Sequence, residues 1–183
     1  MSYILKKIFT IIFVVHLLCG FNYASIAEKD KKTELYEIYS VVLDSMFFQL
    51  DDIHISGRTT KYALNDSTGE FTSLELFIEN YLKIRDVQSV EALKNFYFKQ
   101  NERFYFEDMF TTKAPVTIVP IDKIKNFAVH KEHPKFKNLL FFSTIGLNKE
   151  KTEAIFHVIH YEITSKWIHL KKYQNEWNII LVN

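Results

Sequence analysis

The C-terminal part of the chain constrains the fold most, because β-rich runs alternate there with connections of only a few residues. Four runs are rich in β-branched and aromatic residues: 139–145, 154–164, 167–173 and 177–182. The last three are joined by the polar dipeptides 165–166 and 174–175. A crossover to a parallel neighbour takes a dozen or more residues, so connections this short join antiparallel strands. The sequence therefore predicts an antiparallel four-stranded meander.

The chain before these strands has the period of amphipathic helices. Apolar residues recur at helical spacing over residues 33–49 and predict a first helix there. Thr72 and Glu75 form a capping-box pattern that predicts the start of a second helix. Asp86 or Ser89 is expected to cap a third helix. Helices therefore dominate the part of the chain that precedes the meander.

Two short strands are predicted within this helical part. One is expected around Gly57, beside the β-branched residues that follow it, and the other over residues 116–119 between two prolines. Together these patterns predict an α+β fold, in which N-terminal helices pack on one face of the C-terminal antiparallel meander.

The first residues of the chain have the organisation of a secretory signal. Lys6 and Lys7 precede the apolar run 8–20, which is shorter than the roughly 20 residues that a membrane-spanning helix needs. Small residues upstream then favour cleavage between Ala27 and Glu28. The sequence predicts a signal peptide over residues 1–27, a single α+β domain over residues 28–183, and export to the periplasm or the outside.

Cys19 provides an alternative end to the signal. A lipoprotein signal also finishes its apolar run at a cysteine, so Cys19 is a candidate for lipidation. The bulky Leu18 stands where such a signal has a small residue, which favours cleavage after Ala27 instead. The membrane is then expected to be a partner only through the signal segment or through this lipid.

Composition excludes several classes of function. Hydrophobic residues make up 48% of the chain, which has only 4 glycines and 3 prolines, so it is expected to bury a core. The formal net charge is +1, which gives no broad positive field for binding nucleic acid. Cys19 is the single cysteine. If residues 1–27 are removed, thiol nucleophiles and cysteine-ligated metals are removed with them.

Two stretches carry a family resemblance. The segment 142–148, together with the final strand that begins with Trp177, resembles the C-terminal half of a group of exported bacterial proteins for which no activity is established. Residues 38–43 resemble the way those proteins begin. This resemblance implies the fold and the export of the chain, and no catalytic residue. The Trp-x-Ile ending at residues 177–179 is also similar to that of nuclear-transport-factor-2-like cone folds.

Histidine and tyrosine on the predicted strands are the candidate binding residues. His157 and His160 are three residues apart on a strand, so their side chains should point to opposite faces. His157 alternates with apolar neighbours and is expected to be partly buried. A two-residue turn at 165–166 would place His169 opposite Glu162. The polar ends of His157, Tyr161 and His169 are the candidates for converging in a pocket.

Catalytic and metal-binding patterns are weak. His130 and His133 stand in an H-K-E-H segment, which lacks the i, i+4 spacing that places two imidazoles on one helical face. Ser143 is not flanked by glycines as a nucleophile elbow requires, and Gly146 is interpreted as a turn residue. No catalytic residue, metal site or cofactor is predicted.

Two functions remain open from the sequence. The first is a non-catalytic interaction module of the cell envelope that uses surplus aromatic rings to bind a partner protein or ligand. The second is a small-molecule-binding protein or cone-fold enzyme with a pocket between helices and sheet. A flat aromatic patch would favour the module, and a deep concave pocket that bears two or more of His157, Tyr161 and His169 would favour the alternative.

Overall fold

The computed structural model describes residues 30–60, 73–81, 87–124, 138–160 and 164–182. The chain divides into two compact units, Met1–Tyr36 and Glu37–Asn183. Residues 30–36 of the first unit are helical, and residues 37–46 of the second unit form the helix that we call the first helix. The predicted signal, with its cleavage site at Ala27 and the alternative at Cys19, lies outside the described residues.

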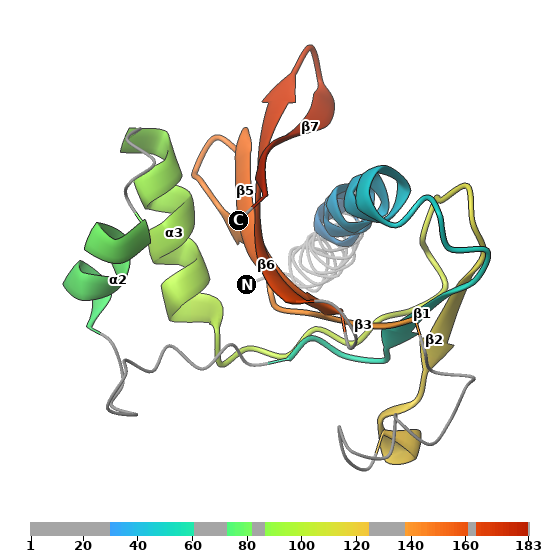
Figure 1. Cartoon of the computed structure of the whole chain (residues 1–183). Helices are drawn as coiled ribbons and strands as arrows, with labels where there is room; N and C mark the ends of the chain where they lie inside the picture. Colours follow the sequence, from blue (N-terminus) through green and yellow to red (C-terminus); the bar gives the residue numbers. More distant parts are fainter. Residues whose placement is uncertain (1–29, 61–72, 82–86, 125–137, 161–163, 183) are drawn as a thin grey trace, which may run out of the picture. The chain divides into compact units, whose positions relative to one another are not determined.

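One mixed sheet of seven strands organises the second unit (Figure 1). Its strands follow the order β2 (Val116–Val119), β1 (Ile53–Ser56), β3 (Leu139–Phe142), β5 (Glu153–His160), β6 (Thr164–Tyr173) and β7 (Glu176–Val182). The short β4 (Gly146–Leu147) pairs with β5 outside this order. A 3₁₀ turn, η1 (Ile121–Lys123), follows β2. The molecule is therefore α+β, as predicted.

The two halves of the sheet differ in strand direction. From β3 through β5 and β6 to β7 every pairing is antiparallel, which confirms that the C-terminal strands are antiparallel. In contrast, β1 pairs in parallel with both β2 and β3. Long segments of chain separate these three strands, which leaves room for the crossovers that parallel pairing requires. The sheet thus has more strands than the four predicted, and the antiparallel C-terminal strands are one part of it.

One face of the sheet is covered by residues 37–46 of the first helix. The ring of Tyr39 packs against Phe142 and Phe156, with ring centroids 4.9 and 5.2 Å apart. Its hydroxyl donates a hydrogen bond of 2.8 Å to the backbone carbonyl of Ser143. This aromatic contact ties the helix to β3, to β5 and to the segment that follows β3.

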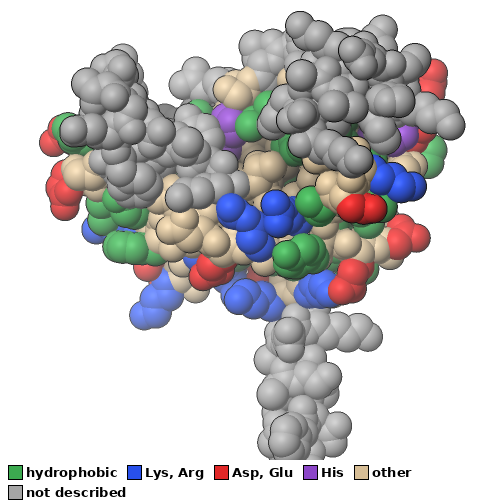
Figure 2. All heavy atoms as spheres, turned by 90° about the horizontal axis from the view of Figure 1, so that it is seen from below, with side chains coloured by type: hydrophobic (Ala, Val, Ile, Leu, Met, Phe, Trp, Pro, Cys, Tyr) green, Lys and Arg blue, Asp and Glu red, His purple; other side chains and the backbone are tan. Residues whose placement is uncertain are grey.

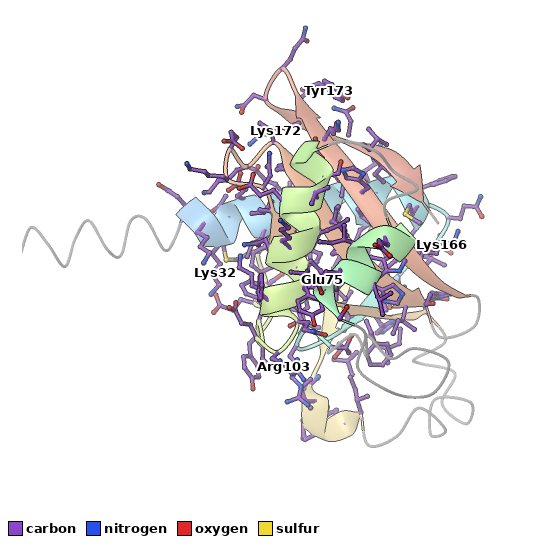
Figure 3. All side chains as sticks on the ribbon, turned by 90° about the vertical axis from the view of Figure 1, so that its left-hand side faces the viewer. Lys32, Glu75, Arg103, Lys166, Lys172 and Tyr173 are labelled. Atoms are coloured by element: carbon purple, nitrogen blue, oxygen red, sulfur yellow. The ribbon has the colours of Figure 1, made fainter. Side chains whose placement is uncertain are left out.

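The other face is covered by α2 (Leu74–Tyr81) and α3 (Val87–Lys99), which lie across the sheet in Figure 3. Phe77 and Phe96 pack there with Trp167, at centroid distances of 5.8 and 5.1 Å. Helices thus cover both faces, and the prediction that they cover one face is wrong. The strand β5 shows why, since it is buried at nearly every position and must be covered on both sides.

The caps of these helices differ from the predicted ones. The Oγ of Ser73 accepts a hydrogen bond of 3.3 Å from the N–H of Leu76, so Ser73 caps α2. The predicted cap Thr72 lies outside the described residues, as does Asp86. Ser89 lies inside α3, where it is buried, and its hydroxyl bonds to the sheet instead of capping the helix.

Glycine is required at position 146 by close packing, rather than by the predicted turn geometry. A Cβ added at this position would lie 2.3 Å from the carbonyl oxygen of Ala92 and 2.5 Å from Phe96. Both atoms belong to α3, whose backbone approaches β4 closely. Only a residue without a side chain leaves room for this approach.

The register of the β5–β6 hairpin corrects the predicted partner of His169. The ladder pairs His160 with Thr164 and His157 with Trp167. His169 consequently lies opposite Ile155, and its predicted pairing with Glu162 is wrong. The polar dipeptide 165–166 belongs to strand β6 instead of forming the turn, which shifts every cross-strand pair of the hairpin.

Candidate functional site

Strands β5 and β6 present different polar groups on their two faces. Side chains alternate along a strand, so Glu153 and His157 of β5 point toward α3, whereas Val158 and His160 point toward the end of the first helix. This confirms that His157 and His160 lie on opposite faces. The two faces are described in turn.

On the α3 face, three polar side chains contact the buried carboxylate of Glu153. The Oγ of Ser89 donates to its Oε2 at 2.8 Å, and the Nε2 of His169 lies 2.9 Å from the same oxygen. The Nζ of Lys171 lies 3.0 Å from Oε1. Glu153 is 1% exposed and His169 is fully buried, while Lys171 is partly exposed. We call these four residues the Glu153 cluster.

A tight turn places Glu153 in this cluster. The Oδ1 of Asn148 accepts hydrogen bonds of 2.8 Å from the backbone N–H groups of both Thr152 and Glu153. Lys151 takes a positive φ of 55° within the same turn. The Asn148 side chain therefore fixes the backbone where β5 begins, which aims the Glu153 side chain at α3.

The Glu153 cluster has the chemistry of a compensated buried charge. In a Ser–His–acid nucleophile the histidine takes the proton of the serine hydroxyl. Here Ser89 and His169 both bond to the carboxylate oxygen instead. Hydrogen bonds and an opposite charge offset the cost of burying a carboxylate. The arrangement therefore stabilises the contact between α3 and the sheet.

His157 lies on the same face and is held neutral. It is 2% exposed, and its ring packs edge-on against Trp167 with centroids 5.2 Å apart. Burial lowers the pKa of His157 from 6.5 to about 4, because the charged imidazolium loses its hydration there. The imidazole lies beside an apolar ring, in keeping with the expectation, but it is fully buried rather than partly buried.

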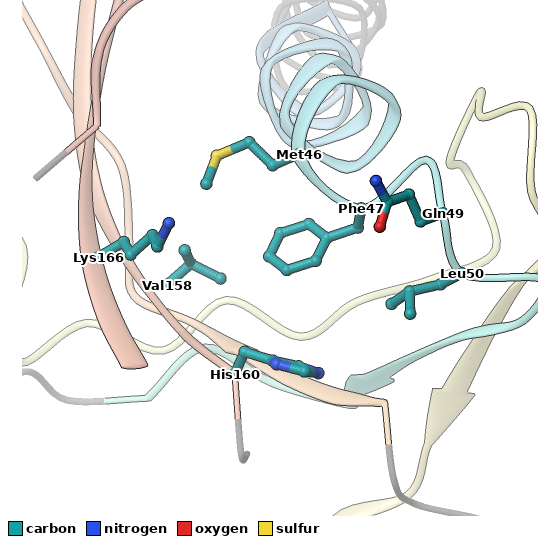
Figure 4. Close-up of a pocket in the computed structure, with 7 residues that line it drawn as sticks. All are labelled: Met46, Phe47, Gln49, Leu50, Val158, His160 and Lys166. Atoms are coloured by element: carbon teal, nitrogen blue, oxygen red, sulfur yellow. The ribbon is translucent and has the colours of Figure 1, made fainter. Parts of the chain in front are cut away.

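On the opposite face, a cavity of about 180 Å³ lies between the end of the first helix and the β5–β6 hairpin. The helix end and the residues after it contribute part of the lining, and the two strands contribute the rest. Its walls are Met46, Phe47, Gln49, Leu50, Val158, His160 and Lys166. In Figure 4 the side chains of Phe47 and Lys166 point into the space between helix and sheet.

The lining of this cavity is apolar with polar groups at its edges. The ring of Phe47 lies 5.9 Å from the ring of His160, which is 8% exposed. Lys166 carries the ammonium group and is half-buried. Within the described residues this ammonium group makes no ion pair or hydrogen bond. Met46, Lys166 and Val158 line one side of the cavity in Figure 4, and Leu50 and Gln49 line the other.

The predicted pocket residues are distributed differently from expectation. His157 and His169 lie on the same face of neighbouring strands, but both are buried beneath α3. Tyr161 lies outside the described residues, as do His130 and His133. Neither His157 nor His169 is among the described residues that line the cavity. The role of these three residues in ligand binding stays a prediction.

Sequence reasoning missed the residues that line the cavity. Lys166 was assigned to a turn, although it belongs to β6, where its side chain shares a face with Val158 of β5. Continuing the alternation of the strand through residues 164–166 would have placed Lys166 on this face. The contribution of the helix end has no local signal, because it depends on how the helix packs.

The surface of the described residues shows mixed charge. Lys, Arg, Asp and Glu side chains alternate on the face shown in Figure 2. The large apolar side chains that are exposed come from different elements: Phe48, Leu76, Phe98, Tyr105, Tyr173 and Ile180. Among the described residues no three His, Cys, Asp or Glu side chains form a group that could hold a metal ion. None of the described helices has the length and the apolar character to cross a membrane.

Comparisons with models of protein families, with curated proteins and with solved structures found no match. The resemblance to the group of exported bacterial proteins stays a prediction. The function has to be argued from the site itself.

Proposed function

We propose that this chain is an exported domain that binds a small, largely apolar molecule in the cavity lined by Phe47, Val158 and Lys166. The single observation that carries this proposal is the cavity of about 180 Å³, in which apolar walls surround a few polar groups. This combination is typical of small-molecule sites. Export is supported by the signal pattern over residues 1–27.

The volume sets the size of the ligand. A cavity of about 150 Å³ lined by apolar side chains is large enough to bind benzene. A cavity of about 180 Å³ therefore admits one six-membered ring with a small substituent. The ring of Phe47 offers an edge or a face for packing such a ligand.

The position of the cavity favours a preformed site. Val158 and His160 lie on β5, which is hydrogen-bonded to β3 and to β6, and Lys166 lies on β6. A site on paired strands keeps its geometry better than one on loops. The opposite wall follows the helix end, where Phe47 and Leu50 are held by backbone hydrogen bonds of 3.0 Å.

A titration monitored by NMR tests this function. Benzene, benzamide and benzoate are each added to the protein, and the methyl signals of Met46, Leu50 and Val158 are followed. We expect saturable shifts at these three methyl-bearing residues with at least one probe. The absence of saturable shifts with all three probes would overturn the proposed function.

A matched pair of variants ties the shifts to the cavity. Leu50→Phe adds volume to the cavity wall and should weaken binding. Leu76→Phe makes the same change at a residue of α2 that is 51% exposed, and binding should be unaffected. If both variants bind the probe equally well, the probe binds outside this cavity.

A further inference from the structure

Among the described residues that line the cavity, one carries a fixed charge, and this charge indicates the chemical class of the ligand. Of the seven lining residues, Lys166 is the only one with a permanently charged side chain. Its ammonium group points into the space between Met46 and Val158 in Figure 4. A half-buried ammonium group beside apolar side chains has lost part of its hydration, and an anionic partner would restore the lost interactions.

We propose that the ligand is a small monocarboxylate whose carboxylate group binds Lys166 and whose apolar part packs against Phe47. This inference rests on the proposed function, because it names the ligand class of the same cavity. Lys166 would donate a charge-assisted hydrogen bond to the carboxylate, which is about twice as strong as a neutral one.

The different surroundings of Lys166 and Lys171, two of the three lysines on β6, support this assignment. The Nζ of Lys171 lies 3.0 Å from the buried carboxylate of Glu153, so its charge is compensated by the protein. Lys166 is on the same strand but faces the cavity, where the described residues supply no carboxylate. A ligand carboxylate would give Lys166 the partner that Glu153 gives Lys171.

Charge and volume together favour a monocarboxylate over a phosphate. A phosphate monoester carries a charge of about −1.5 to −2 at neutral pH. A single ammonium group would leave part of that charge without compensation in an apolar cavity, which is costly. A carboxylate carries one negative charge and leaves most of the roughly 180 Å³ for an apolar ring or chain.

Two probes of the same shape isolate the role of charge. Benzoate and benzamide differ mainly in that benzoate is an anion, and their affinities for the full domain can be compared by isothermal titration calorimetry. We expect benzoate to bind about tenfold more tightly than benzamide, as one charge-assisted hydrogen bond at a partly solvated site allows. Phenyl phosphate should bind more weakly than benzoate.

Variants assign this preference to one side chain. Lys166→Met retains most of the volume and removes the charge, so benzoate affinity should fall to that of benzamide, which itself should not change. Lys94→Met makes the same substitution on an exposed lysine of α3 and should leave both affinities unchanged. Far-UV circular dichroism of both variants checks that they are folded.

The outcomes separate the two proposals. If benzamide binds the wild-type protein as tightly as benzoate, the carboxylate inference is overturned and the small-molecule function stands. A benzoate preference that survives in Lys166→Met also overturns the inference. If no probe binds, the proposed function fails, and the inference fails with it.

Discussion

The two faces of the β5–β6 hairpin differ in whether their charged groups have partners among the described residues. On the α3 face, Glu153 is 1% exposed and is surrounded by Ser89, His169 and Lys171. On the face of the first helix, Lys166 lies at an apolar cavity without an ion-pair partner among the described residues. Among the described residues, the same strands therefore hold one charge that the fold compensates and one for which we propose a ligand as the partner.

We interpret this difference as one between a structural polar group, Glu153, and a proposed ligand-binding group, Lys166. A buried carboxylate with three short contacts has few ways to interact with a ligand, and its contacts join α3 to the sheet. A half-buried ammonium group beside a cavity can accept a partner from solution. Burial alone would have selected Glu153 and His169 as the candidate binding site. The contacts of each group select Lys166 instead, because its ammonium group has no ion-pair partner among the described residues.

Glu153→Ala should have the largest effect on stability. Removing one member of a buried ion pair costs about 3–5 kcal/mol, and here the buried Ser89 and His169 lose their hydrogen-bond partner while the partly exposed Lys171 loses its opposite charge. The measurement is the free energy of unfolding from urea denaturation. Glu91→Ala, at an exposed position of α3, is the control and should change it by less than about 0.5 kcal/mol. Equal effects of both variants would mean that the Glu153 cluster contributes nothing to stability.

Protonation of His157 should lower stability in acid. Its pKa is about 4 in the folded protein and near 6.5 when unfolded, so the unfolded chain binds the extra proton between these values. Above pH 6.5 His157 is neutral in both states and the free energy of unfolding keeps its full value. As the pH falls from 6.5 toward 4, the free energy of unfolding decreases by about 3 kcal/mol. His157→Gln should show a smaller loss than the wild type in urea denaturation over this range. Parallel pH profiles of the two proteins would contradict the assignment.

Gly146→Ala should destabilise the contact between β4 and α3. The added Cβ would lie 2.3 Å from a backbone oxygen, so the helix or the strand must move. Overpacking of this kind costs about 1–3 kcal/mol. Gly57→Ala meets its nearest atom at 3.0 Å and should cost less. Thermal unfolding of the two variants compares them directly, and the reverse order would refute the close approach of α3.

Lys166→Met should have the smallest effect on stability. The described residues give its ammonium group no ion pair, so its removal should change the free energy of unfolding by less than about 0.5 kcal/mol. Lys171→Met removes the partner of Glu153 and should destabilise the protein clearly more. If the two lysine variants are equally destabilised, the two faces do not differ in the way proposed.

Local sequence patterns predicted the elements better than their packing. The first helix, the strand at residues 116–119 and the antiparallel C-terminal strands follow from the spacing of apolar residues along short segments. The parallel pairing of β1 with β3 joins distant parts of the chain and has no local signal. The polar pair Ser165 and Lys166 has the composition of a turn, and this led to the wrong partner for His169.

The sites were harder to predict than the fold. Strand alternation predicted apolar neighbours for His157, but it predicted a partly buried ring, whereas the packing of α3 buries the ring fully. The partners of Glu153 come from α3 and from the far end of β6, so they could be recognised only once the register was known. The cavity depends on the packing of the helix end against two strands, which no single segment encodes.

A crystal structure of the protein grown in the presence of benzoate tests the central claim most directly. The account predicts electron density for the benzoate ring between Phe47 and Val158, with its carboxylate within hydrogen-bond distance of the Lys166 Nζ. Benzoate bound at another place, or a cavity that holds only water at saturating benzoate, would contradict it.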